Sequence, residues 1–161
     1  MLLVLSLIAC SNSKIPEDAI FYDITVTTAD LEDGLGGGVD ECHPDSTEGY
    51  EKTFEYALAF DGTKATIYIG EDVFASGTIQ GCRLTYSTVV IGGETEEDGA
   101  IKWQLFGSAD VDPSEGNACV EGDSDWRGTE AFVIVNSENE TLEPGCEYRT
   151  NTYGGLVVSA E

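Results

Sequence analysis

Basic residues are scarce in this chain. Its 161 residues include 7 lysines and arginines against 31 aspartates and glutamates, so the formal net charge is −24 at pH 7. Nucleic-acid binding and electrostatic attachment to anionic lipid headgroups both need clustered Lys and Arg, so the composition argues against both kinds of partner. A charge of this size also destabilises a compact state through self-repulsion. Three explanations stay open: high external salt that screens the charge, bound divalent cations, and solvated acidic loops that keep the protein soluble.

A segment long enough to span a membrane is missing from the amino-terminal end. The apolar run from Leu2 to Ala9, interrupted by Ser6, is much shorter than the roughly 20 residues that a spanning helix needs. It fits the hydrophobic region of a signal peptide, which has about 7–15 residues and ends in small ones. A buried first strand is the alternative. Signal peptides begin with basic residues, and the first one here is Lys14, so either the true translation start lies upstream of Met1 or the segment is not a signal peptide.

The segment Leu7-Ile8-Ala9-Cys10 resembles the lipobox of bacterial lipoproteins. In that family, signal peptidase II cuts before the cysteine, whose thiol carries diacylglycerol. The resemblance implies a signal peptide over 1–9 and a lipidated tether over 10–18. The remaining residues, 19–161, contain no sign of a second domain and are expected to form a single β domain. The resemblance also implies an extracytoplasmic protein that is held at a membrane by covalent lipid. Ser11 follows the cysteine where some proteobacteria place a retention aspartate, which favours the outer membrane or cell surface.

The remaining cysteines are even in number. Setting Cys10 aside for lipid leaves four in an exported domain, which predicts two disulfides with three connectivities open. No two of them have the close C-x-x-C spacing of a zinc or redox motif, so structural bridges are expected. The four candidates are Cys42, Cys82, Cys119 and Cys146.

Apolar residues alternate with a period of two, which predicts an all-β fold. The clearest signal is Asp61-Gly62 between two alternating runs, a pattern typical of a tight hairpin. Seven or eight antiparallel strands in a meander fit a small, disulfide-braced up-and-down barrel, with a two-layer sandwich as the alternative. The barrel is favoured because closure removes exposed strand edges. The expected strands cover 20–26, 54–60, 65–69, 73–79, 82–91, 101–105, 129–136 and a segment from about 146, with a short edge at 156–158 and long loops at 30–49, 92–99 and 110–128.

Catalytic signals are weak. The single histidine, His43, adjoins Cys42, and a nucleophilic pair there would need a free thiolate, whereas Cys42 is expected to be bridged. The nucleophile elbow G-x-S-x-G and the zinc helix H-E-x-x-H do not occur. Paired carboxylates could hydrolyse glycosides, but among 31 acidic residues such pairs arise by chance.

One acidic segment has partial calcium-loop spacing. Asp110, Asp112, Ser114 and Glu121 occupy positions one, three, five and twelve of an EF-hand pattern, yet Glu115 replaces the glycine of the sharp turn. A looser calcium loop is therefore the hypothesis, with a solvated acidic loop as the alternative and no other cofactor expected. The candidate ligands are Asp110, Asp112, Glu121, Asp123 and Asp125.

The two tryptophans have different neighbours. Trp103 alternates with Lys102 and Gln104, which indicates core packing, whereas Trp126 lies in a polar segment and is expected to plug one end of the barrel.

Taken together, the lipobox, the cysteines, the β pattern and the weak catalytic signals favour a non-enzymatic, lipid-anchored envelope module, structural or ligand-binding, whose protein or small-molecule partner the sequence does not identify. A calcium-dependent binding or adhesion domain and an extracytoplasmic hydrolase with acidic residues are the alternatives.

Overall fold

Eight antiparallel strands make up the described part of the chain. The computed structural model describes residues 15–28, 51–92, 101–113, 119–120, 124–138, 144–145 and 147–157. The strands are β1 (Ile20–Thr28), β2 (Glu51–Asp61), β3 (Lys64–Ile69), β4 (Asp72–Gln80), β5 (Arg83–Gly92), β6 (Ile101–Val111), β7 (Trp126–Ser137) and β8 (Glu147–Leu156).

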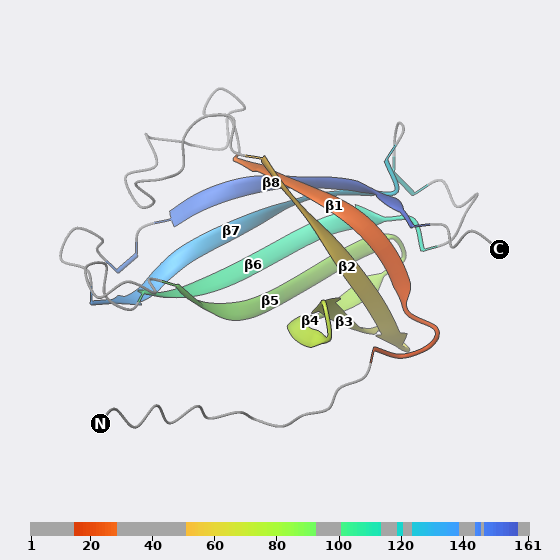
Figure 1. Ribbon diagram of the computed structural model, residues 1–161, viewed down its shortest axis with the longest axis horizontal. Helices are drawn as coiled ribbons and strands as arrows, with labels where there is room; N and C mark the ends of the chain where they lie inside the picture. Colours follow the sequence, from red (N-terminus) through yellow and green to blue (C-terminus); the bar gives the residue numbers. More distant parts are fainter. Residues whose placement is uncertain are drawn as a thin grey trace.

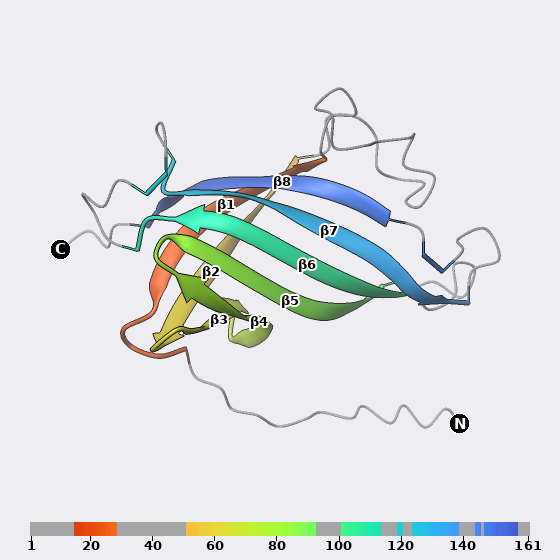
Figure 2. The same ribbon diagram turned by 180° about the vertical axis from the view of Figure 1, so that it is seen from behind.

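The strands close into an up-and-down barrel. Each strand pairs with the next along the chain, and β1 pairs with β8, for example at Tyr22 and Leu156. Figure 1 shows β5 to β8 side by side in one wall, with β1 and β2 crossing in front of it; Figure 2 shows the same wall from behind. The predicted barrel is therefore confirmed, and the sandwich is not adopted. Closure pairs both edges of the meander and leaves no long strand edge free.

The tight turns are made as the sequence indicates. Asp61 pairs with Lys64, and the two residues between them begin with Gly62 at a φ of 63°. A positive φ at the first central residue but not at the second, Thr63, is typical of a type II′ turn, whose twist matches that of the flanking strands. Gly70 and Gly81 take the same place in the β3–β4 and β4–β5 turns.

The core of the molecule is the barrel interior. Along β6, buried and more exposed residues alternate without a break from Ile101 to Val111, so one face of the strand points inward. Trp103 is among the inward residues, as predicted. The largest fully buried side chains come from several strands and fill the interior with apolar and aromatic groups: Trp126, Tyr22, Tyr56, Ile24, Leu58, Ile67, Leu84 and Leu105.

Several strands are longer than the alternation indicates, and for β6 and β7 the difference changes the connection between them. β6 runs to Val111 and β7 begins at Trp126, so the connection expected over 110–128 is shorter at both ends. Trp126 is therefore the first residue of a strand, and its ring lies inside the barrel rather than in a polar loop. Leu156 ends β8 and starts no separate edge strand among the described residues.

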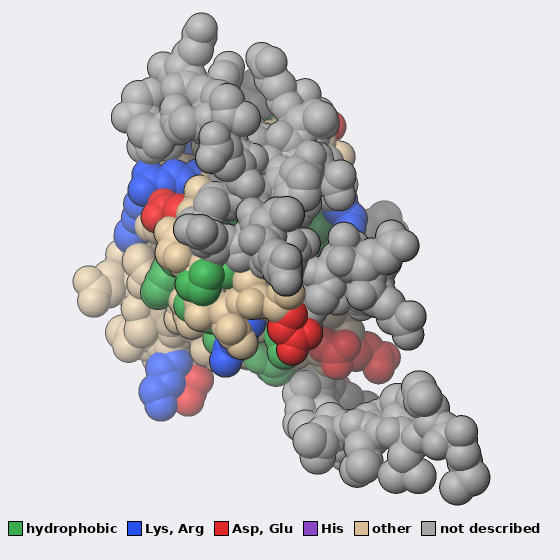
Figure 3. All heavy atoms as spheres, turned by 90° about the vertical axis from the view of Figure 1, so that its left-hand side faces the viewer, with side chains coloured by type: hydrophobic (Ala, Val, Ile, Leu, Met, Phe, Trp, Pro, Cys, Tyr) green, Lys and Arg blue, Asp and Glu red, His purple; other side chains and the backbone are tan. Residues whose placement is uncertain are grey.

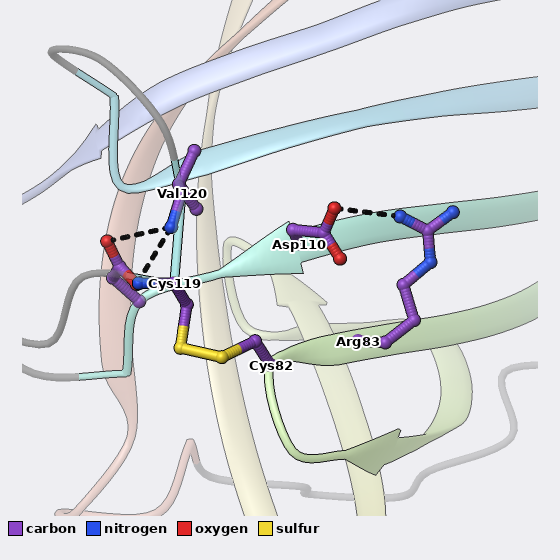
Figure 4. A network of polar contacts seen from close by, with 6 residues as sticks. Cys82, Arg83, Asp110, Cys119 and Val120 are labelled. Carbon is purple, nitrogen blue, oxygen red and sulfur yellow. Dashed lines mark hydrogen bonds and ion pairs between the residues drawn. A yellow bond between two sulfur atoms is a disulfide. The ribbon is translucent and has the colours of Figure 1, made fainter.

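One of the expected disulfides lies within the described residues. Cys82, next to the first residue of β5, is bonded to Cys119 in the β6–β7 connection (Figure 4). This bridge ties the connection to the turn between β4 and β5. Of the three connectivities, it is compatible only with the one that joins Cys42 to Cys146, and both of these cysteines lie outside the described residues.

The described surface is mixed. Figure 3 shows basic, acidic and hydrophobic side chains side by side at one end of the barrel. Large hydrophobic side chains exposed on the strands include Val73, Val89, Ile91, Phe106 and Val135. Within the described ranges, no helix is long and apolar enough to cross a membrane. The lipobox, the tether up to Lys14 and the acidic loops 30–49 and 93–99 lie outside these ranges.

Candidate functional site

A carboxylic acid lies inside the apolar barrel. Glu130 shares the inward face of β7 with Phe132 and Ile134, and only 2% of the residue is exposed to solvent. An ionised carboxylate is costly in such surroundings unless hydrogen bonds compensate for its lost hydration. The neighbours of Glu130 therefore decide its state.

Three hydroxyl groups converge on this carboxyl. The Tyr86 hydroxyl donates to Oε1 over 2.7 Å, and the Tyr56 hydroxyl approaches the same oxygen at 3.5 Å. The Thr150 hydroxyl lies 3.5 Å from Oε2. Four strands thus supply one polar cluster, Glu130 from β7, Tyr86 from β5, Tyr56 from β2 and Thr150 from β8.

Burial controls the protonation of this cluster. It raises the pKa of Glu130 above the usual range, although the hydrogen bonds from Tyr86, Thr150 and Tyr56 act in the opposite direction. Burial likewise raises the pKa values of Tyr56 and Tyr86, and the nearby Glu130 carboxylate raises them further. The cluster therefore favours neutral groups.

Trp126 fills the interior next to this cluster. Its ring contacts those of Tyr22, Tyr56 and Tyr86, with ring centroids 5.5, 5.8 and 6.2 Å away. Its Nε1 donates to the Thr152 hydroxyl over 3.0 Å. Such aromatic pairs contribute about 0.5–1.5 kcal/mol each beyond burial. The tryptophan acts as the interior plug that was expected, in a packed and hydrogen-bonded position.

The β6–β7 connection begins at the same end of the barrel, because Val111, the last residue of β6, pairs with Trp126. The Asp112 carboxylate accepts hydrogen bonds from the backbone N–H groups of Cys119 and Val120. The Tyr22 hydroxyl donates to the backbone oxygen of Asp112 over 2.8 Å. With the Cys82–Cys119 bridge, these contacts hold the connection against the barrel (Figure 4). The interior at this end is therefore occupied by the protein's own side chains.

A hollow of about 590 Å³ lies on the outer wall instead, over β5 to β8. Arg83, Arg127 and Tyr153 are exposed, whereas their chain neighbours Leu84, Trp126 and Thr152 are buried, so the first three point away from the barrel interior. The side chains that give the hollow its chemistry are Arg83, Ser108, Asp110, Arg127, Thr129, Asn151 and Tyr153.

Strand register arranges these residues in two rows. Arg83 is opposite Asp110, Asp110 is opposite Arg127, and Arg127 is opposite Tyr153. The next outward row is Ser108, Thr129 and Asn151. Arg83 and Asp110 form an ion pair of 3.0 Å, seen in Figure 4. Side chains directly opposite on neighbouring strands lie about 5 Å apart at Cβ, so both rows can contact one small ligand.

Three of the five proposed calcium ligands lie within the described residues, and each contacts another group of the protein. Asp110 pairs with Arg83 on the outer wall, and Asp112 is bonded to backbone N–H groups. The Asp125 carboxylate accepts a hydrogen bond from the N–H of Leu156. No group of three or more metal-ligating side chains occurs in the ranges that the structure describes. Glu121 and Asp123, like His43, lie outside those ranges, so the calcium hypothesis stays a prediction.

Sequence reasoning did not single out the hollow or the buried acid. Glu130 is in phase with Phe132 and Ile134, and this phase alone could have identified it as an inward residue. The hollow has no such local signal, because its residues come from four strands and meet only through register. Among the candidates selected from the sequence, Asp110 is the one that lines it.

The described lining of the hollow is mainly neutral and basic, with hydroxyl, amide and guanidinium groups. The described lining contains one carboxylate, Asp110, whereas glycoside hydrolysis commonly uses two carboxyl groups about 5–10 Å apart. Comparisons with known proteins found no matching family model, no similar curated protein and no similar solved structure.

Proposed function

We propose that this protein is a non-enzymatic binding module of the cell envelope, tethered by lipid on Cys10, which binds a small polar ligand on its outer wall. The hollow over β5 to β8 carries the proposal, because hydrogen-bonding side chains converge there around an open volume. Ligand sites are typically concave, with a few convergent polar groups that fix orientation.

The packed interior supports an outer site over an inner one. Eight-stranded barrels either fill their interior with side chains or hold one small ligand. Here Trp126, Tyr22 and Leu58 occupy it with no exposed surface. A ligand inside would have to displace these rings, which would cost several kcal/mol of packing.

Binding can be tested by filling the hollow. The full chain, kept in detergent, is applied to an array of immobilised saccharides alongside Thr129→Trp, which places an indole in the hollow. Thr53→Trp on β2 is the matched control, because Thr53 is also exposed but lies outside the lining. The proposal expects at least one saccharide that binds the wild-type chain and the control but not Thr129→Trp. If no saccharide distinguishes the two variants, the outer-wall binding function is wrong.

The lipid anchor has its own test. Mass spectrometry of the membrane fraction is expected to find a mature chain that begins at an acylated Cys10. A chain that keeps residues 1–9, or a Cys10 thiol without lipid, would contradict the anchor and leave the binding proposal standing.

A further inference from the structure

The hollow is positively charged on an acidic molecule. Its described lining carries two guanidinium groups, Arg83 and Arg127, and one carboxylate, Asp110. The chain as a whole has 31 acidic residues against 7 basic ones. Two of the seven basic residues of the chain therefore lie together at one concave surface of an acidic protein. This arrangement favours a ligand with negative charge.

Arg127 is the cation that is available to such a ligand. Arg83 pairs with Asp110, and Arg149 pairs with Glu147. Among the described residues, Arg127 takes part in no ion pair, although Asp110 lies opposite it on β6. The planar guanidinium can bind a carboxylate through two parallel N–H···O hydrogen bonds, which fixes orientation and adds affinity.

The other groups of the hollow match a sugar ring. Ser108, Thr129 and Asn151 supply hydroxyl and amide groups that can both donate and accept, as ring hydroxyls require. Tyr153, at the end of the arginine row, is 40% exposed and offers an apolar ring face with a polar tip. The Arg83–Asp110 pair is about half exposed, and exposed pairs contribute at most about 1 kcal/mol, so Asp110 can also turn to a ligand hydroxyl at low cost.

We propose that the hollow binds an acidic saccharide, a sugar ring that carries a carboxylate. The carboxylate lies on Arg127, the ring hydroxyls contact Asp110, Thr129 and Asn151, and one ring face packs on Tyr153. This inference rests on the proposed binding function and names the ligand class of the same site.

Titration calorimetry with defined probes tests the ligand class. The full chain in detergent, at about 0.15 M salt so that its net charge is screened beyond about 8 Å, is titrated with tri-galacturonate and with the fully methyl-esterified trisaccharide. Esterification removes the charge and keeps the ring hydroxyls. We expect the acid to bind at least about tenfold more tightly than the ester, since charge-assisted hydrogen bonds contribute roughly 1.5–3 kcal/mol.

Two arginine variants locate the contact. Arg127→Gln is expected to lose this preference and to bind the acid at least about tenfold more weakly. Arg149→Gln, on β8 outside the lining, removes the same charge and should leave the Kd within about twofold, because an exposed distant charge is largely screened. Equal binding of acid and ester, or equal effects of the two variants, would overturn the acidic-saccharide proposal.

The remaining outcomes separate the two proposals. If neither trisaccharide binds while the array still shows binding that Thr129→Trp abolishes, the ligand class is wrong and the binding function stands. If inorganic phosphate displaces tri-galacturonate and binds as tightly on its own, the hollow is a simple anion site and the saccharide proposal is overturned.

Discussion

Glu130 is the residue at which the barrel interior departs from apolar packing. Its carboxyl is enclosed by β2, β5, β7 and β8, and it accepts a 2.7 Å hydrogen bond from Tyr86. Burial raises its pKa, so the folded protein keeps the proton at pH values where the unfolded chain has released it. The free energy of unfolding that this group contributes is therefore complete below the ordinary pKa of about 4.3 and decreases as pH rises to the folded pKa.

Glu130→Gln should remove this pH dependence. A glutamine can accept from Tyr86 through its oxygen and donate to Thr150 through its nitrogen, and it carries no proton to lose. We expect the thermal midpoint of the variant, relative to wild type, to increase as pH is raised from about 4 towards neutrality. Glu55→Gln makes the same substitution at an exposed residue of β2 and should show no such trend. A parallel pH profile for the Glu130→Gln variant and wild type would mean that Glu130 is ionised in the fold.

Gly107 makes room for the partner of Glu130. A Cβ at this position would lie 2.0 to 2.6 Å from three atoms of the Tyr86 ring. Gly107→Ala must therefore push the ring away from Glu130, and overpacking of this kind costs about 1–3 kcal/mol. Gly155→Ala is the matched control, since its nearest contact would be Asp125 Oδ2 at 3.6 Å. Urea unfolding should show a loss for Gly107→Ala and a change within about 0.5 kcal/mol for Gly155→Ala; equal effects would contradict the close packing.

At the scale of elements, the β6–β7 connection depends on one covalent tie. The Cys82–Cys119 bridge joins residues 37 positions apart, for which chain entropy predicts about 4 kcal/mol of stabilisation. The double variant Cys82→Ala/Cys119→Ala should lose stability of that order in denaturant unfolding. Because Tyr22 donates to the backbone oxygen of Asp112 in the connection and packs on the Trp126 ring, we also expect the indole fluorescence of Trp126 to change. Unchanged stability would mean that the hydrogen bonds of Asp112 hold the connection without the bridge.

The strands were predictable from local pattern, and the hollow was not. Apolar residues at Phe54, Tyr56 and Leu58 alternate along β2, and Gly62 makes the turn that follows. The sequence pattern places Trp126 in a loop rather than in a strand, because its neighbours Asp125 and Arg127 are polar. In the fold, Arg127 points outward and Asp125 bonds to the backbone of Leu156, so polar neighbours are compatible with a buried ring.

Register explains why the site residues could not be found from sequence. Arg83, Asp110, Arg127 and Tyr153 share no spacing along the chain, and each belongs to a different strand. Their row depends on three strand pairings, β5 with β6, β6 with β7 and β7 with β8. A slip of one residue in any pairing would turn that strand's side chains to the opposite face. Long-range pairing therefore creates the hollow.

At the scale of the whole molecule, the formal charge of −24 sets the dependence of stability on salt. Repulsion among acidic groups acts over about 30 Å at 0.01 M ionic strength and over about 3 Å at 1 M. The midpoint of thermal melting should therefore rise with increasing NaCl concentration. A parallel series in a neutral osmolyte is the control for solvent effects that do not depend on charge. A midpoint that is independent of NaCl would show that the acidic side chains are already neutralised by bound cations or lie far apart.

Calcium distinguishes screening from specific binding. CaCl₂ and NaCl are compared at equal ionic strength, so that screening contributes equally and any additional rise in the melting midpoint reports calcium that binds the folded state. A site that includes Glu121 and Asp123 predicts an extra rise at millimolar calcium, and Asp123→Asn should reduce it. Asp23→Asn, an exposed residue of β1, removes the same charge outside the proposed loop and should leave it intact. A ligand raises stability only by binding the folded protein more tightly than the unfolded chain. Coincident CaCl₂ and NaCl curves would therefore eliminate the calcium loop, and screening alone would then account for the effect of salt on stability.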